Sequence, residues 1–548
     1  MGLLLPFEPA EADYPNHLAL PEPERLRLPP AAWLMTAMVV LCLVPRAMMA
    51  HRLPGICPDG VLYIHAAKAV EAGNARLAFN DLDFNIYPIV IAGMHRLGFD
   101  WELGAMVWGV AISSLVVLPL WGWLRRQFDD RVALMACMLY AVHPKFIEWS
   151  PEIMRDPTFW MLFMLSIYWL WRGATEVRLR YYLAALAAII LATLTRIEGV
   201  FLLIPLVLWT FWRWRALEPN TAGSLSRLSP RRKLLFGLAL CAIVPPGLAA
   251  IVHFGWLQEN AGWSLFRLDP LERVQSWLAH LYSGSPGNDP AASTMTVFDM
   301  AWIYFPTLTR GLSPIYALAM LGGLWGWRRL WARRDNQPLF YVAASILCAI
   351  WIHLWYGRNI CPRYVLPIVL MASPFAALGL LGFVERLARL AGRFRLSVGS
   401  TTIATIVFGA VFAAGLTDAM TCNRSYFAGR RTDRDVGQWV LHEFPAPTVL
   451  VGPFGLVQIA SYYAADSAYQ AFLCDASNEY ILDLIESSRA DAVLLRPAKE
   501  LTPERCAELV ELLREKGYAP VRPDAMPTDE PGYIILVRAD RKDLVHVR

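Results

Sequence analysis

The sequence predicts a polytopic α-helical membrane protein with about eleven transmembrane helices, interfacial helices in the first outer loop and a small C-terminal α/β soluble domain. Three observations predict this fold class. Of the 548 residues, 56% are hydrophobic and only 18% are charged, whereas soluble proteins carry about 25% charged residues. A series of apolar runs is long enough to cross a bilayer. After residue 417 these runs become short and charged residues return.

The order of these features divides the chain into three predicted parts. Residues 1–31 are expected to form a cytoplasmic N-terminal tail, because they lack the basic segment and apolar core of a signal peptide. Residues 32–417 are the predicted transmembrane domain, and residues 418–548 the predicted extracytoplasmic domain. The candidate spans are residues 32–50, 103–124, 132–148, 157–172, 180–195, 198–214, 234–255, 312–331, 338–356, 364–383 and 398–417.

Basic loops orient the predicted bundle. Cytoplasmic loops of membrane proteins carry the excess of Lys and Arg, so the basic loops and the N-terminus are assigned to the cytoplasm. The first loop (51–101), the loop around Asp156, the loop 256–311 and everything after Leu416 then lie outside a cell membrane, either inner or plasma. The basic loops lie at residues 125–131, 172–180, 213–233, 328–334 and 386–395.

The first outer loop contains two amphipathic stretches, residues 59–73 and 86–97. Their apolar residues recur at helical spacing, which suits helices that lie in the membrane interface. The alternative is that these helices only cap the bundle.

The C-terminal region alternates between helical and extended patterns, which favours a small α/β domain. No glycine-rich phosphate loop marks it as a nucleotide site. The expected helices are Thr432–Phe444 with Thr432 as N-cap, 478–489 and 502–516, and the expected strands are 448–451, 492–495 and 533–537.

Cysteines provide a weaker signal. In an oxidising compartment, Cys57 with Cys361 or Cys422 with Cys474 could form disulfides, although sequence alone does not fix the connectivity. The sequence has no CxxC or HExxH motif, so it does not indicate a dedicated zinc site.

Ionisable residues gather at the predicted outer ends of the spans. Charged groups at membrane edges are costly to desolvate and are often functional. A single such residue is more simply a solvated helix end. Two acidic loops on the same side as three basic helix ends, however, favour a functional site. The residues concerned are Asp59, Lys145, Glu148, Glu152, Arg155, Asp156, Arg196, Glu198, Arg363 and Tyr364.

The order of these motifs resembles the membrane glycosyltransferases that use polyprenyl-phosphate sugars. This group includes the protein O-mannosyltransferases, the lipid A aminoarabinose transferases and related lipopolysaccharide-core transferases. The resemblance rests on Asp-Gly-Val-Leu-Tyr at 59–63, Asn-Ile-Tyr-Pro at 85–88, the segment 143–157 that ends in Arg-Asp-Pro, Arg-Ile-Glu-Gly at 196–199 and Arg-Tyr-Val-Leu-Pro at 363–367.

The resemblance implies a C-type glycosyltransferase fold with an outer-face active site, and it implies residue roles. Asp59 and Asp156 would be catalytic: Asp59 as general base on the acceptor hydroxyl or as ligand of a divalent cation (Mg or Mn), and Asp156 as a cation ligand or as a group that orients the acceptor. Guanidinium groups would bind the phosphate. The implied substrate-binding residues are Glu152, Lys145, Arg155, Arg196, Arg363, Tyr364, Tyr63 and Tyr87.

The implied reaction moves a hexosyl or pentosyl group from a polyprenyl-phosphate donor to a cell-envelope lipid, glycan or protein, with inversion at the anomeric carbon. Membrane lipids surround the protein, and no nucleic acid partner is expected. Gly60 stands where the protein O-mannosyltransferases have the second residue of an Asp-Glu pair. This difference favours the broader bacterial group.

Two other classes of function stay open at this point. A multi-span lipid or sugar transporter or flippase would carry ionisable groups near the bilayer midplane. Here most predicted span interiors are uncharged, and Arg46 is the main exception. A non-catalytic scaffold that binds a partner through the outer domain is the third class.

Overall fold

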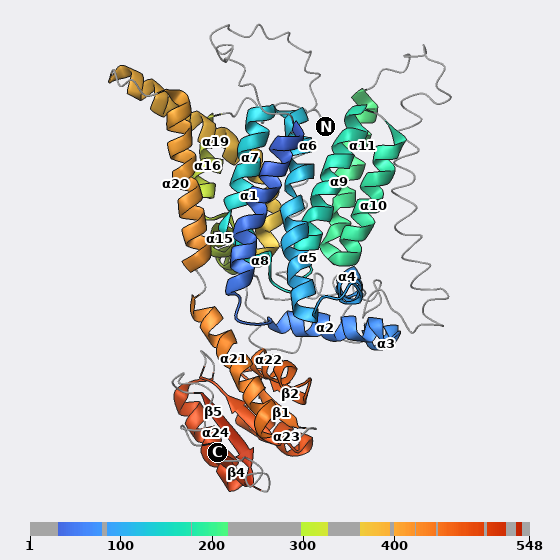
Figure 1. Cartoon of the computed structure of the whole chain (residues 1–548), viewed down its shortest axis with the longest axis vertical. Helices are drawn as coiled ribbons and strands as arrows, with labels where there is room; N and C mark the ends of the chain where they lie inside the picture. Colours follow the sequence, from blue (N-terminus) through green and yellow to red (C-terminus); the bar gives the residue numbers. More distant parts are fainter. Residues whose placement is uncertain are drawn as a thin grey trace.

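The computed structural model describes residues 31–78, 85–176, 178–216, 297–326, 362–394, 399–421, 424–444, 448–497, 501–521 and 533–539. Helices form one bundle, and a smaller sheet domain lies at one end of it (Figure 1). The helices of the bundle and its loops are α1 (Ala31–Arg52), α2 (Pro58–Glu71), α3 (Ala75–Ala78), α4 (Ile86–Arg96), α5 (Trp101–Leu115), α6 (Val117–Gln127), α7 (Asp130–Val142), α8 (Pro144–Trp149), α9 (Asp156–Glu176), α10 (Leu179–Thr195), η2 (Ile197–Leu202), α11 (Leu203–Ala216), α15 (Val297–Leu312), α16 (Pro314–Gly326), η5 (Pro362–Val365), α19 (Leu366–Arg393) and α20 (Ser400–Thr421).

Four helical segments of the described chain are long and apolar enough to cross a membrane: Ala32–Arg52, Trp101–Gln127, Pro362–Arg393 and Thr401–Thr421. Shorter apolar helices accompany them in α10, α11 and α16. The candidate spans 234–255 and 338–356, and most of the predicted N-terminal tail, lie outside the described residues. The count of about eleven spans therefore stays a prediction.

Two regions differ from the sequence prediction. The stretch 132–148 is not one helix, because His143 precedes Pro144 and has an extended backbone (ψ 120°), as residues before proline prefer. By contrast, the predicted span 103–124 lies within the helical segment Trp101–Gln127, in which Val116 separates α5 from α6 and keeps a helical backbone. Residues 297–311, which were expected to belong to the loop 256–311, form helix α15. This helix contains an internal proline, Pro306, a residue that usually argues against a helix in a sequence.

The break after α7 is closed by Arg46, which is fully buried in α1. Its guanidinium donates to the carbonyl oxygens of Ala141 at 3.2 Å and Tyr140 at 3.4 Å, and its Nε donates to Ser150 Oγ at 3.1 Å. The last carbonyls of a helix carry the negative end of its dipole, so a cation there is stabilising. This contact accounts for an ionisable residue inside the first span without a transport role.

Helices α16 and α19 approach each other backbone to backbone. A Cβ added at Gly379 would collide with the carbonyl oxygen of Ala319, and one at Gly323 with that of Phe375. Small residues permit such close packing between membrane helices.

The C-terminal sheet has the strand order β2-β1-β3-β5-β4. Strand β1 is parallel to β2 and β3, whereas β5 is antiparallel to β3 and β4. The elements are α21 (Arg424–Glu443), β1 (Val449–Pro453), α22 (Leu456–Tyr463), β2 (Ala468–Phe472), α23 (Asn478–Ser488), β3 (Ala492–Leu495), α24 (Pro503–Glu515), β4 (Tyr518–Pro520) and β5 (Ile534–Arg538).

The predicted start of the helix at Thr432 is wrong. Helix α21 begins at Arg424, and Thr432 lies within it and is buried. The residues before Thr432 continue the helix, so the Thr-x-x-Asp pattern that resembles a capping box is internal. The suggested disulfide between Cys57 and Cys361 is not formed, because Cys57 is free. The suggested partner of Cys474, Cys422, lies outside the described residues, as does Cys361, so the pair Cys422–Cys474 stays a prediction.

The sheet domain meets the bundle beside α2 (Figure 1). Ile459 of α22 joins a buried apolar cluster with Ile56, Val61 and Ile153 of the bundle loops. Lys68 of α2 forms an ion pair with Asp466 at 2.5 Å. The two parts of the chain therefore share a core at this interface.

Gly379→Ala should lower the melting temperature of the detergent-solubilised protein, because the added methyl has no room between α16 and α19. Overpacking costs roughly 1–3 kcal/mol. The control is Gly409→Ala in α20, where an added Cβ meets nothing within 4 Å and Ala is the better helix former. Equal melting temperatures for the two variants would contradict the close contact.

Candidate functional site

Two carboxylates stand at helix starts at the same end of the bundle. Asp59 is the second residue of α2, after Pro58, and Asp156 is the first residue of α9. Negative charge is favoured in the first turn of a helix. The segments that precede both residues are irregular, so their positions depend on tertiary contacts.

The cations come from other segments. Arg196 has an extended backbone between α10 and η2, and Arg363 lies in η5 immediately before α19. Arg155 immediately precedes Asp156. Two guanidinium groups that are far apart along the chain, those of Arg196 and Arg363, thus reach the two aspartates.

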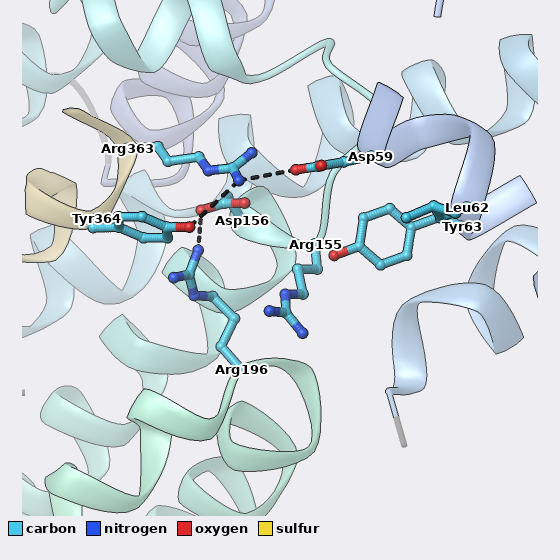
Figure 2. A pocket seen from close by; sticks show the side chains of 8 residues that line it. All are labelled: Asp59, Leu62, Tyr63, Arg155, Asp156, Arg196, Arg363 and Tyr364. Atoms are coloured by element: carbon cyan, nitrogen blue, oxygen red, sulfur yellow. Dashed lines mark hydrogen bonds and ion pairs between the residues drawn. The ribbon is translucent and has the colours of Figure 1, made fainter. Parts of the chain in front are cut away.

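These side chains line one pocket of about 160 Å³. Figure 2 shows them converging on it from α2, the loop before α9, the turn after α10 and η5. The lining residues are Asp59, Leu62, Tyr63, Arg155, Asp156, Arg196, Arg363 and Tyr364.

Each aspartate is paired with a different arginine. Arg363 Nη2 lies 2.9 Å from Asp59 Oδ2, and Arg196 forms an ion pair with Asp156 and a second one with Glu198 at 2.7 Å. The side chain of Asp59 is 40% exposed, whereas that of Asp156 is 4% exposed. Asp59 is therefore the carboxylate that is open to a ligand, and Asp156 is enclosed.

Arg155 differs from the other two arginines. Among the described residues its side chain has neither an ion pair nor a hydrogen bond, although it lines the pocket. In Figure 2 its guanidinium lies between the side chains of Arg196 and Tyr63. Tyr364 provides an aromatic surface, with the Arg196 Cζ 4.7 Å and the Arg363 Cζ 5.3 Å from its ring centroid. Such distances allow cation–π attraction.

Two pKa shifts describe the electrostatics of the pocket. Burial raises the pKa of the Tyr63 phenol to about 12, so this group is a hydrogen-bond donor at neutral pH. Burial lowers the pKa of Arg196, but the neighbouring Asp156 and Glu198 carboxylates raise it by more, and the net shift is upward. Arg196 thus stays charged despite its enclosure.

Three of the predicted substrate-binding residues do not line the pocket. Lys145 pairs with Glu148 at 2.6 Å, and Glu152 pairs with Arg430 of the sheet domain at 2.6 Å. Tyr87 is fully buried behind Tyr63, with the ring centroids 5.1 Å apart. The other predicted residues, Asp59, Asp156, Arg155, Arg196, Arg363, Tyr364 and Tyr63, are brought together.

Sequence reasoning did not identify two residues near the site. Leu62 lines the pocket, and its position three residues after Asp59 on one helix could have indicated it. Arg430, the partner of Glu152, lies 278 residues away in sequence, and no local pattern signals that contact.

Packing explains why position 60 holds a glycine, where the protein O-mannosyltransferases have the Glu of an Asp-Glu pair. A Cβ at this position would lie 2.7 Å from Ile56 Cγ1 and 3.0 Å from Ile153 Cβ. A Glu next to Asp59 would therefore not fit this packing.

The donor set of the pocket suits an anion better than a divalent cation. Both aspartates already pair with guanidinium groups, and three arginines line the pocket against two aspartates. Among the described residues, no group of three or more His, Cys, Asp or Glu side chains is placed to hold a metal. Hard divalent cations prefer several oxygen ligands, so we assign no step to a metal.

Arg196→Met should destabilise the protein by about 3–5 kcal/mol, because it leaves Asp156 and Glu198 enclosed without their cation. Thermal unfolding in detergent measures this loss. Arg155→Met is the matched control, since Arg155 has no ion pair among the described residues, and its melting temperature should stay close to that of the unmodified protein. A stable Arg196→Met variant would show that the network does not support the fold.

Comparisons with known proteins identify the fold. The family model for dolichyl-phosphate-mannose-protein mannosyltransferase matches residues 86–226. No curated protein matches the sequence. The crystal structure of ArnT from Cupriavidus metallidurans bound to undecaprenyl phosphate aligns with a TM-score of 0.58 at 13% identity, and the alignment covers 95% of this chain and 100% of that chain.

Two structures of the oligosaccharyltransferase from Archaeoglobus fulgidus are also similar. The complex with Zn and sulfate has a TM-score of 0.51 at 13% identity, covering 90% of this chain and 72% of that chain. The complex of this enzyme, AglB, with an inhibitory peptide and a dolichol-phosphate has a TM-score of 0.50 at 12% identity, covering 90% and 74%. The chain is thus a membrane protein with the GT-C fold of the polyprenyl-phosphate-sugar glycosyltransferases, the group that its motifs resemble.

Proposed function

We propose that the protein is a membrane glycosyltransferase that moves a sugar from a polyprenyl-phosphate donor to a cell-envelope lipid, glycan or protein. The observation that carries this proposal is the pocket, where an accessible carboxylate, Asp59, lies beside arginines that suit a phosphate. The relatives support the donor class, because ArnT was crystallised with undecaprenyl phosphate and AglB with a dolichol-phosphate.

The chemistry requires a base and a stabilised leaving group. In the transfer, the acceptor hydroxyl loses its proton while its oxygen forms a bond to the anomeric carbon of the sugar. The bond between that carbon and the phosphate oxygen breaks, and its electron pair leaves with the polyprenyl phosphate. General-base catalysis assists the first event, and fixed positive charge assists the second.

Exposure separates the roles of the two aspartates. Asp59, at 40% exposure, can reach an acceptor hydroxyl and is the proposed base. Asp156 is enclosed and is held by Arg196, so its proposed role is to orient the arginine and to balance its charge. The second role does not require contact with the acceptor.

The donor phosphate is proposed to bind between Arg155 and Arg363. Arg155 has no carboxylate partner among the described residues, so binding an anion costs it no existing ion pair. The buried Nε of Arg363 also lacks a hydrogen-bond partner in the described part of the chain. Guanidinium groups bind phosphate through paired N–H donors.

The sidedness of the reaction rests on the basic loops. Arg125, Arg126 and Arg131 lie at the end of α6 and the start of α7, at the opposite end of the bundle from α2 and the sheet domain (Figure 1). With those arginines in the cytoplasm, the pocket and residues 424–539 face outward. We therefore propose that transfer occurs on the outer face of a cell membrane.

No observation in the described spans favours the transporter or flippase alternative. Arg46 is engaged by helix-end carbonyls, and the pocket charges gather at one end of the bundle. Movement of lipid or sugar in proteoliposomes, without any glycosidic product, would nevertheless decide for that alternative.

Asp156→Asn should abolish transfer of a labelled sugar from a polyprenyl-phosphate donor and lower the melting temperature, because Arg196 loses an enclosed partner. Asp59→Asn should abolish transfer while expression and folding stay unchanged, because it removes the proposed base. Removal of a general base costs about 10²–10⁴-fold in rate. Mass analysis of envelope glycans and lipids in a deletion strain would first identify the product to assay. Normal activity in both variants would disprove the site.

Arg155→Met should weaken binding of undecaprenyl phosphate by about 10–100-fold, which corresponds to the loss of a charged hydrogen bond of about 1.5–3 kcal/mol. Binding to the protein in nanodiscs measures this change. The control is Arg514→Met in α24, an exposed residue of the sheet domain. Equal affinity in the two variants would remove Arg155 from the phosphate site.

A further inference from the structure

The two aspartates of the pocket are each preceded by an irregular segment. Residues 53–57 link α1 to Asp59, and residues 150–155 link α8 to Asp156. Both segments are largely buried, and they touch where Cys57 Sγ lies 3.8 Å from the Ile153 carbonyl oxygen. Because neither segment is regular, the separation of the two aspartates depends on the contacts that hold these segments.

One residue of the sheet domain contacts both segments. Arg430 of α21 is 3% exposed, and its Nη1 donates to Glu152 Oε1 at 2.6 Å. Its Nε donates to the Ile56 carbonyl oxygen at 3.2 Å, and its Nη2 donates to the Gly55 carbonyl oxygen. A single guanidinium therefore joins the approach to Asp59 to the approach to Asp156.

Two further residues of the same domain hold the first segment. Arg434, one helical turn after Arg430, donates to the Pro54 carbonyl oxygen at 3.0 Å. The Tyr463 hydroxyl of α22 accepts from the Ile56 N–H at 3.0 Å and donates to Glu102 Oε2 at 3.0 Å. The backbone of residues 54–56 is thus fixed by the sheet domain at consecutive positions.

The local packing leaves this segment little freedom. A Cβ at Gly55 would lie 2.9 Å from the Tyr463 hydroxyl oxygen, so a side chain at this position would displace the Tyr463 ring that holds the loop. Gly437 likewise lets α21 and α22 pack backbone to backbone, since a Cβ there would collide with the Ala460 carbonyl oxygen. The two helices that carry Arg430 and Tyr463 therefore form one closely packed pair.

We infer that Arg430 is a positioning residue of the active site, through which the C-terminal domain sets the separation of Asp59 and Asp156. This inference rests on the proposed function. Arg430 does not line the pocket; it acts through the backbone of residues 55–56 and through Glu152. A reacting group that is misplaced by 1 Å can cost about 100-fold in rate, so the contact is expected to govern turnover rather than donor binding.

The test replaces the ion pair without leaving a lone buried charge. In the full-length protein, Arg430→Met is combined with Glu152→Met, because replacing both members of a buried ion pair by apolar side chains often leaves stability unchanged. The double variant keeps an apolar contact at this position but lacks the N–H donors to the Gly55 and Ile56 carbonyl oxygens. The expected result is a folded protein with faster amide exchange in residues 53–60 and 150–156. Its kcat should be about 100-fold lower, with the donor KM nearly unchanged.

Controls separate positioning from stability. The exposed pair Arg514 and Glu511, 2.5 Å apart, receives the same double Met substitution and should change neither exchange nor kcat. Arg430→Lys serves as the test if the double variant fails to fold. The lysine keeps a positive charge for Glu152 but cannot reach both carbonyl oxygens, so this variant should be stable and show the same loss of kcat.

The outcomes also separate this inference from the proposed function. Unchanged exchange in both segments, or a wild-type kcat in a folded double variant, would overturn the positioning role. A different result would be faster amide exchange in the double variant while the unmodified protein transfers no sugar from any polyprenyl-phosphate donor. That result would overturn the proposed function but would still establish the contact of Arg430 with the two segments.

Discussion

The pairing of buried charges at one end of the bundle is the constraint on which the rest of the structure depends. An ionised group is costly to bury unless an opposite charge and hydrogen bonds accompany it. Asp156, Glu152 and Glu148 are each less than 5% exposed, and each has a cationic partner. Two of these partners, Arg196 and Arg430, lie on other segments than the carboxylates they pair with, so pairing these charges also fixes how the segments meet.

The same constraint explains which residues reach the pocket. Lys145 and Glu152 lie near Asp156 in sequence, but each is taken by another partner, Glu148 or Arg430. Arg155, next to Asp156, is left without one in the described residues. One guanidinium of the pocket therefore has no carboxylate within ion-pair distance in the described part of the chain, which leaves it available to bind an anion.

Much of this arrangement could be predicted from the sequence, because the side of the membrane on which a loop lies follows from the charges of short segments of the chain. Basic loops and apolar runs placed Asp59, Asp156, Arg196 and Arg363 on one face, and the structure brings these side chains into one pocket. The choice of partner was not predictable, since it depends on side chains that meet only in the folded chain. Tyr87 shows this limit: its motif position was recognised, but its burial behind Tyr63 was not.

The C-terminal region shows a similar division. Strand β3 (Ala492–Leu495) has four buried apolar residues in succession and coincides with the predicted strand. Strand β2 (Ala468–Phe472) was not predicted, because it lies at the edge of the sheet and exposes alternate residues. The start of α21 was placed too late because Thr432 and Asp435 imitate a helix start, and only tertiary contacts show that the helix extends further back.

The contact of Arg430 with Ile56 joins residues 374 positions apart. Chains are synthesised from the N-terminus, so the loop before Asp59 is made long before its partner in α21 exists. The pocket can reach its final shape only after almost the entire bundle has been inserted. A partly made or truncated chain would therefore hold the aspartates without their final spacing, and biosynthesis itself delays the moment at which the pocket is complete.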